Sequence, residues 1–292
     1  MIVSYKKTWF VVLLFLVVVF SLSGCTDGAG ESTFEKAKKE GYVRIGFANE
    51  APYAYATEEG KVTGLNVEIA RAILKELGID EIVPVVTEFG SLIPGLQAKR
   101  FDMITAGAYI TPERAKEVAF ANPEYQIGGG IAVRAGNPYN ITSYFDIADN
   151  PEIKVAVMAG GLEYNHMIAC GVAEEQIETV PDQPSTIDAL IAGRVDVITM
   201  TSMALRTYVN TANNPDIEYV EDFEVAVIDG KPQAGFGSSA FRHEDSDFLE
   251  AYNQELQKLK DSGKLLEILE QFGFSEAEFP GYITTEELLE NW

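Results

Sequence analysis

The sequence predicts an α/β protein built from two similar lobes with a cleft between them. The first observation is a repeated stretch: residues 93–105 read IPGLQAKRFDMIT and residues 187–199 read IDALIAGRVDVIT, with seven of thirteen positions identical. Two copies are too few for a solenoid, which needs three or more units. The second observation is that strand and helix patterns alternate around both copies, as α/β proteins require.

The first half of the chain alternates strands with helices. Val67, Ala70, Ile73 and Leu74 mark one apolar helical face, and Gly78 is typical of a helix end. The expected elements are strands at 42–47, 82–87 and 101–105, with helices at 66–77 and 91–98 between them. This β-α-β-α-β order predicts parallel strands covered by helices.

The second half repeats this order, so the repeated stretch falls on a helix, a turn and a strand in both lobes. The expected elements are strands at 154–158, 176–180 and 195–199, with helices at 162–169 and 185–192. An amphipathic helix at 248–272, broken at Ser262 and Gly263, is expected to return to the first lobe. The predicted crossings lie near 133–138 and 229–237, which are rich in glycine or proline, as a hinge needs. Lobe 1 would then contain residues 41–134 and 236–292, and lobe 2 residues 135–235.

The N-terminus predicts export. Lys6 and Lys7 precede an apolar run at 9–20, which is too short for a confident membrane span and reads as a signal peptide over residues 1–24. The end of that run, LSGC, resembles the lipobox of bacterial lipoproteins, in which the signal is cut before Cys25 and its thiol is acylated. An uncleaved helical anchor is the alternative. With a lipid on Cys25, residues 25–40 would tether an extracytoplasmic protein to the membrane.

Charge and rare residues exclude several functions. The formal charge is −23, and loss of residues 1–24 removes two lysines and no acids, which leaves −25. Such acidity argues against nucleic acid as a partner, and it suits either a high-salt habitat or an ordinary acidic surface. With Cys25 assigned to the lipid, Cys170 is the remaining cysteine, and a single thiol predicts no intramolecular disulfide. His166 and His243 are the two histidines, and neither lies at a metal-ligand spacing, so no metal site is expected. Motifs for a serine hydrolase, a phosphate-binding loop or a dinucleotide cofactor are absent, so no catalytic residue and no cofactor is expected.

The ordered segments VRIGFANEAPYAY, GKVTGLNVEIARAI, LIPGLQAKRFDMITAG, ITPERAKEVAFANP and LQKLKDSGKLLEILEQFGF carry a resemblance across the whole mature chain. The chain resembles the extracytoplasmic solute-binding proteins of ABC importers, in the branch that mostly binds polar amino acids. The resemblance implies a periplasmic-binding-protein fold with the ligand in the interlobe cleft. It also implies a monomer that is not an enzyme and whose partner is the ABC permease.

Three aromatic residues and an arginine follow the strands of the first lobe, where open α/β sheets bind ligands. Tyr53, Phe89 and Tyr109 are either core residues or the walls of a cage for a cation. Arg114 follows a proline at an expected helix start. The resemblance implies that Arg114 grips a ligand carboxylate as a bidentate pair, whereas a surface salt bridge is the plainer interpretation.

The expected acid of an amino-acid binder is missing from lobe 2, where Thr199 to Ser202 read TMTS. The nearer resemblance is to the ectoine and hydroxyectoine binding proteins of the same branch. It implies that Glu50 and Glu163 accept the ring N–H groups of ectoine and that Gly161 and Leu162 offer backbone N–H groups to its carboxylate. Leu162 stands where that group is expected to have a threonine.

Two other functions stay open from the sequence. A binder of a polar amino acid such as glutamine or arginine has the same architecture. A dehydratase is known on this kind of fold, and it would need Glu50 or Glu163 as a general acid or base.

Overall fold

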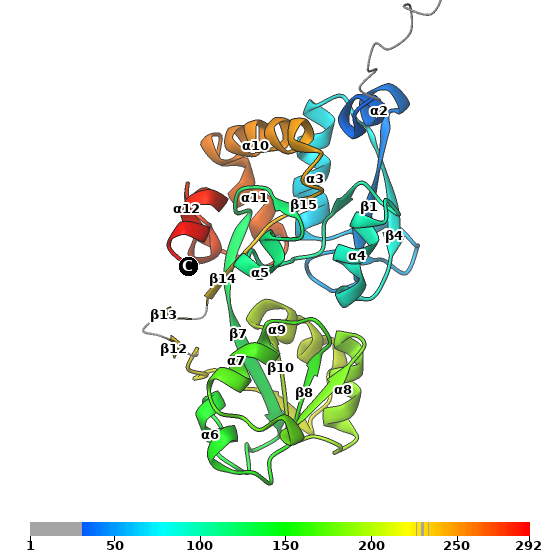
Figure 1. The fold of residues 1–292 in the computed structure, drawn as a ribbon. Coiled ribbons are helices and arrows are strands. Elements are labelled where there is room, and N and C mark those ends of the chain that lie inside the picture. Colours follow the sequence, from blue (N-terminus) through cyan, green and yellow to red (C-terminus); the bar gives the residue numbers. More distant parts are fainter. Residues whose placement is uncertain (1–30, 226, 229–230, 233) are drawn as a thin grey trace, which may run out of the picture.

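The computed structural model describes residues 31–225, 227–228, 231–232 and 234–292, which form two lobes, each a β-sheet covered by helices (Figure 1). The sheet of lobe 1 has the order β4-β1-β5-β15-β6, and that of lobe 2 has the order β11-β7-β10-β8-β9, with β14 also paired to β7. The signal peptide and Cys25, both predicted from the sequence, lie outside the described residues.

Lobe 1 follows the predicted alternation. Its sheet contains β1 (Tyr42–Phe47), β4 (Glu81–Val86), β5 (Met103–Ile104), β6 (Ala119–Phe120) and β15 (Ala240–Phe241). The first three strands are parallel, and β15 is antiparallel to β5 and β6. Its other elements before the crossing are β2 (Tyr55–Ala56), β3 (Val62–Thr63), α3 (Leu65–Glu76), η1 (Phe89–Ser91), α4 (Leu92–Gln97) and α5 (Pro112–Ala115). Helix α3 buries its apolar face completely, as its periodicity predicts.

Lobe 2 repeats the pattern. Its sheet contains β7 (Tyr125–Arg134), β8 (Val155–Met158), β9 (Ile177–Val180), β10 (Val197–Thr201) and β11 (Ile217–Tyr219). The covering helices are α6 (Tyr144–Asp149), α7 (Glu163–Ala169), η2 (Glu174–Gln176), α8 (Gln183–Ile191) and α9 (Ser202–Ala212). Strands β8, β9 and β10 are parallel, and β7 and β11 are antiparallel additions that the repeat does not predict.

The C-terminal helices return to lobe 1, as predicted. Helix α10 (Ser246–Asp261) ends before α11 (Lys264–Gln271), and Gly263 between them has φ +78°, a conformation that favours glycine. Helix α2 (Thr33–Glu40), in the range expected to be a tether, packs on α10 through Phe34, whose ring stacks on Phe248 at 5.0 Å. The last elements are η3 (Glu276–Glu278) and α12 (Thr285–Glu290).

The chain crosses between lobes earlier than the sequence suggested. Strand β7 pairs with β14 (Ala234–Gly237) over residues 125–128 and with β10 over residues 129–133. Residue Val133 therefore already lies inside the lobe 2 sheet, and the expected crossing near 133–138 is wrong. Gly136 and Pro138 instead belong to the turn after β7, which explains why their composition resembled a hinge. A small pair of strands, β12 (Val227–Ile228) and β13 (Lys231–Pro232), precedes β14.

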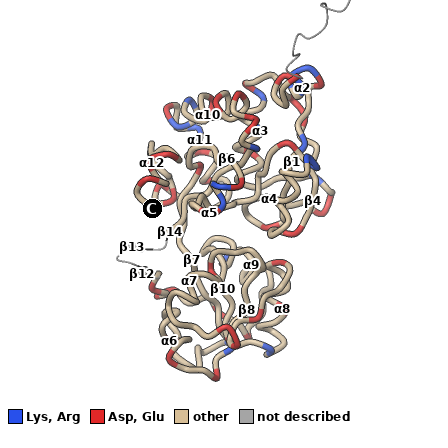
Figure 2. Tube along the Cα trace, viewed as in Figure 1, with Lys and Arg blue, Asp and Glu red and all other residues tan. Residues whose placement is uncertain are grey.

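Charged residues of both signs lie along the outer helices of lobe 1, such as α2 and α10 (Figure 2). The cores of both lobes consist of buried aliphatic and aromatic side chains. Within the part of the chain that the structure describes, no helix combines the length and the apolar character needed to cross a bilayer.

Candidate functional site

The predicted residues of lobe 1 begin at a tight turn after β1. The backbone of Glu50 pairs with Ala54 in both directions, at 2.8 and 2.9 Å, which holds the Glu50 side chain at the carboxyl end of the strand. Glu50 is buried, with 6% of its surface exposed. The turn also presents Tyr53, whose ring stacks on Tyr125 with centroids 5.3 Å apart.

Arg114 and Phe89 face each other at the lobe boundary. Thr111 caps the short helix α5 by accepting a hydrogen bond from the Arg114 N–H. The Arg114 guanidinium lies over the Phe89 ring, 5.4 Å from its centroid, and donates to the Tyr109 carbonyl at 2.9 Å. Its second terminal nitrogen donates across the cleft to the Gly160 carbonyl, also at 2.9 Å. Within the described part of the chain Arg114 forms no salt bridge, so the plainer interpretation, a surface salt bridge, is not observed there.

A cavity of about 140 Å³ marks this end of the interlobe cleft. Phe89, Gly90 and Arg114 line it from lobe 1, together with apolar residues of that lobe, and Gly160 closes it from lobe 2. The lobes approach closely here, because a Cβ atom on Gly160 would lie 3.0 Å from the Gly90 Cα. The positive φ of Gly160, +83°, adds a second reason for glycine at this turn.

Glu163 enters the cleft from lobe 2 as the first residue of α7, and it is buried. Gly161 favours this placement, since a Cβ atom there would lie 2.7 Å from a Glu163 carboxylate oxygen and would displace that carboxylate. The Gly161 N–H already donates to the Met158 carbonyl at 3.1 Å. Leu162 is partly buried and packs against the main hydrophobic core.

Two hydrogen bonds between side chains and one from the backbone join the two lobes around Glu50. The Tyr53 hydroxyl donates to Thr201 Oγ1 at 2.7 Å, and both groups are buried. Gln183 Nε2 donates to Glu50 Oε1 at 3.1 Å, and the Ala51 N–H donates to the Tyr208 hydroxyl at 3.3 Å. The three bonds hold lobe 2 helices α8 and α9 against the Glu50 turn.

Burial makes the cleft sensitive to charge. It raises the pKa of Glu50 to about 8, with the nearby Glu163 carboxylate adding to the effect and the Gln183 hydrogen bond opposing it. Burial also raises the pKa of Glu163, against its own backbone N–H and the positive charge of Arg114. Burial lowers the pKa of Arg114, and the negative charge of Glu163 opposes this by raising it. Arg114 is therefore coupled to Glu163, and Glu163 in turn acts on Glu50 from the opposite lobe.

The three aromatic residues predicted for the site differ in how much of their surface is exposed. Phe89 is half-exposed, whereas Tyr53 is 1% exposed with Gly107 against its ring. Tyr109 is 7% exposed; its ring packs against Gly235 of β14, and its hydroxyl donates to the Ile127 carbonyl at 3.1 Å. The hydroxyl groups of Tyr53 and Tyr109 are thus already hydrogen-bonded, to Thr201 and to the crossing strand β7.

The structure brings the predicted residues from both lobes to one boundary, and it adds residues that sequence reasoning missed. Gln183 and Tyr208 contact the Glu50 turn, and Tyr144, which is buried, interacts with Glu163 and bonds Thr199 at 2.6 Å. Gln183 lies beside the helix-capping Asp182, so the sequence marks it only as the start of a helix.

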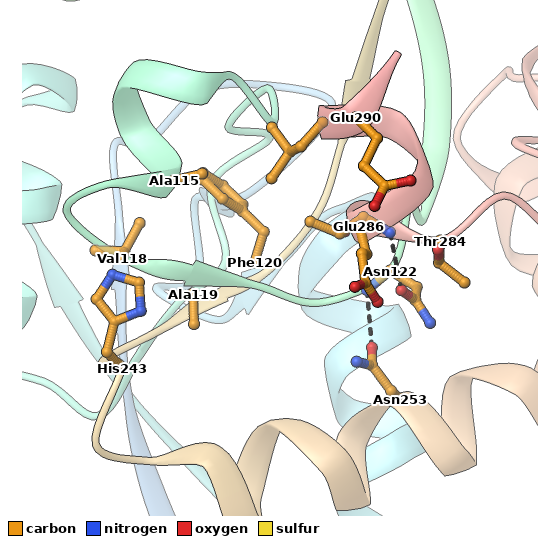
Figure 3. Close-up of a pocket in the computed structure, with 12 residues that line it drawn as sticks. Ala115, Val118, Ala119, Phe120, Asn122, His243, Asn253, Thr284, Glu286 and Glu290 are labelled. Atoms are coloured by element: carbon orange, nitrogen blue, oxygen red, sulfur yellow. Dashed lines mark hydrogen bonds between the residues drawn. The ribbon is translucent and has the colours of Figure 1, made fainter. Parts of the chain in front are cut away.

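A separate groove of about 700 Å³ lies on lobe 1 between β6, α10 and α12 (Figure 3). Phe120, His243 and Asn253 line it, and Thr285 fixes α12 by donating its hydroxyl to the Ala121 carbonyl. The groove contains none of the predicted site residues. Among the described residues, no group of His, Cys, Asp and Glu side chains is placed to hold a metal ion.

Comparison with known proteins agrees with this arrangement. Residues 43–276 match the family model described as bacterial extracellular solute-binding proteins, family 3. The chain is 39% identical over 269 residues, 90% of its length and 88% of the relative's, to "Probable amino-acid ABC transporter periplasmic-binding protein y4tE" of Sinorhizobium fredii.

Two solved structures share the fold. EhuB, crystallised in complex with hydroxyectoine, is 37% identical with a TM-score of 0.77, covering 83% of this chain and 92% of that one. An ancestral arginine-binding protein bound to arginine is 28% identical with a TM-score of 0.69, covering 80% and 98%. The two-lobed periplasmic-binding-protein fold predicted from the sequence is confirmed. The chain therefore belongs to the bacterial extracellular solute-binding proteins, family 3, as a non-catalytic solute-binding component of an ABC importer.

Proposed function

We propose that this protein captures ectoine or hydroxyectoine in the interlobe cleft and delivers it to its ABC permease. The observation that carries the proposal is a chain of charges across the lobes: Glu163 acts on Glu50 from the opposite lobe and is itself coupled to Arg114, which lies over the Phe89 ring. Ectoine is a cyclic amidinium carboxylate, so it brings one cation and one anion to this set of groups.

The charges of solute and cleft are complementary. The amidinium N–H groups find acceptors in Glu50 and Glu163, and the positive charge offsets the repulsion between these two carboxylates. The solute carboxylate pairs with Arg114, which would exchange its Gly160 carbonyl partner for a charge-assisted bidentate contact. Phe89 and Tyr109 supply ring faces for the delocalised cation, with Tyr53, Gly161 and Leu162 completing the surrounding walls.

A polar amino acid is the second candidate solute, favoured by the amino-acid-binding description of the S. fredii relative and by the arginine-bound ancestral structure. Against it stands Thr201. Its hydroxyl is buried and engaged by Tyr53, and no acid occupies that strand end to receive an α-ammonium group. The identity of 37% to a protein crystallised with hydroxyectoine supports the first candidate.

The mode of attachment belongs to the same proposal. A lipid on Cys25 would tether the protein outside the cytoplasm, with the helix α2 joining the anchor segment to lobe 1. The lobe boundary would run through β7 where its partner changes from β14 to β10, at residues 128–129, so that lobe 1 contains 41–128 and 234–292. A monomer with this hinge is sufficient to capture one solute between its lobes.

The test is isothermal titration of the mature, unlipidated protein with ectoine, hydroxyectoine, glycine betaine, glutamine and arginine. Micromolar or tighter binding of ectoine or hydroxyectoine, with no heat from glutamine and arginine, is the expected result. Binding of an amino acid alone would replace the first candidate with the second.

Replacing Phe89 with leucine tests the ring face. We expect Kd for ectoine to rise about tenfold, because leucine keeps the apolar contact and loses the attraction between ring and cation. Titration measures the change, and Phe34→Leu is the control, because Lys38 lies 5.2 Å from the centroid of this partly buried ring on α2, which packs on α10. An unchanged Kd for the Phe89 variant would remove this ring from the site.

A further inference from the structure

Gln183 joins the two lobes at the centre of the cleft. It is the first residue of α8 in lobe 2, with 4% of its surface exposed, and its position is fixed by the Asp182 cap that accepts the Ser185 N–H. Its Nε2 donates to Glu50 Oε1 at 3.1 Å, and both side chains are buried. The contact uses one of the two carboxylate oxygens of Glu50.

The other half of the Gln183 amide has no partner. Its Oε1 is buried and makes no hydrogen bond within the described part of the chain. Unpaired buried acceptors are rare in folded proteins and call for an explanation. Because Oε1 shares a carbon with the nitrogen that contacts Glu50, this acceptor lies beside the carboxylate proposed to receive the solute cation.

A neutral acceptor suits this position better than a third acid. Glu50 and Glu163 already place two interacting carboxylates here, of which Glu163 is coupled to Arg114, and each raises the cost of burying another negative charge. Two other lobe 2 groups near the Glu50 turn are already engaged as acceptors, Thr201 by the Tyr53 hydroxyl and the Tyr208 hydroxyl by the Ala51 N–H. The Gln183 amide oxygen is thus an acceptor from lobe 2 for a solute N–H group, and it adds no charge to the site.

We propose that Gln183 is a specificity-determining residue of the solute site, with Oε1 accepting an N–H from the cationic group of the solute while Nε2 holds Glu50 Oε1. The second Glu50 oxygen is thereby left to the same cation. The inference rests on the proposed function only in requiring a solute whose cation carries N–H donors. It predicts a preference for such solutes over quaternary ammonium compounds, which have none.

The experiment is a titration cycle with the wild type, Gln183→Met, Glu50→Gln and the double variant. Methionine keeps the length of the side chain and removes both amide atoms. Ectoine, hydroxyectoine and arginine are the N–H-bearing solutes, and glycine betaine is the probe without N–H. The matched control is Gln176→Met, which removes a buried lobe 2 glutamine whose amide bonds the carbonyls of Ile147, Asn150 and Ile153.

A direct contact predicts that Gln183→Met raises Kd about ten- to a hundredfold for the N–H-bearing solute, as expected for a hydrogen bond to a charged group. The loss should persist in the Glu50→Gln background, any affinity for glycine betaine should be unchanged, and thermal melting should move little. Gln176→Met should instead lower the melting temperature and leave Kd unchanged.

The other outcomes overturn the inference. An unchanged Kd would show that Gln183 does not meet the solute, and a loss that vanishes in the Glu50→Gln background would reduce Gln183 to a residue that only positions Glu50. If the wild type binds arginine and not ectoine, the proposed function is wrong. The inference about Gln183 is then tested by titrating the same four proteins with arginine. A wild type that binds no N–H-bearing solute contradicts both proposals.

Discussion

Arg114→Ala is expected to raise the Kd for the solute about a hundredfold or more while the protein stays folded. Among the described residues, Arg114 is the cation that favours the ionised form of the cleft carboxylate Glu163. A bidentate pair with a solute carboxylate is among the stronger contacts that a protein can make. Removing it also takes away the positive charge that favours ionised Glu163 and the hydrogen bond to the Gly160 carbonyl, which weakens lobe closure.

Titration of Arg114→Ala, Arg114→Lys and Arg206→Ala measures this effect. Lysine keeps the charge but loses the planar fork, so we expect it to recover only part of the affinity. Arg206 is the control, because it too lies over an aromatic ring, Tyr219 at 4.0 Å, and pairs with Glu221 away from the cleft. Equal affinities for wild type and Arg114→Ala would contradict the site assignment.

Lowering the pH from about 8 towards 5 is expected to favour contact between the lobes in protein measured without added solute. Closing the cleft buries Glu50 and raises its pKa from an ordinary value of 4.5 to about 8, so the closed form binds a proton that the open form releases. Between these two pKa values the closed form therefore becomes more stable relative to the open form as the pH falls. Above about pH 8 both forms are ionised and the dependence disappears.

The expected slope is up to about 1.4 kcal/mol per pH unit for one proton, a tenfold change in the closed-to-open ratio. Glu163 adds to it with the same sign, since burial raises its pKa as well. Small-angle scattering, or energy transfer between labels on the two lobes, reports the closed fraction. Glu50→Gln should reduce the slope by about one proton, and an unaltered slope would show that another group controls closure.

A cationic solute should reduce this dependence. Its positive charge beside Glu50 favours the ionised carboxylate, so closure around the solute takes up fewer protons than closure alone. Closed fractions at pH 6 and pH 8 are therefore expected to converge at saturating ectoine.

Most elements of the fold were predictable from local pattern. Helix α3 and strand β1 lie within a residue or two of their predicted bounds, since apolar periodicity and terminal glycines are properties of neighbouring residues. The crossing between lobes was misplaced because it depends on which strand β7 pairs with, and two partners share that one strand. Pairing over such separations leaves no local signal in the sequence.

The sequence by itself determined the two α/β lobes and a set of acids, aromatics and an arginine at strand ends. It also predicted an export signal. Only the tertiary structure decided which of these groups share an environment. It buried Glu50 against Gln183 and turned the Tyr53 hydroxyl to Thr201, 148 residues away. It also brought Glu163 near enough to Glu50 to raise its pKa. The physical reason is that burial, charge coupling and buried hydrogen bonds arise between residues distant in the chain, and only the packing of one lobe on the other sets them.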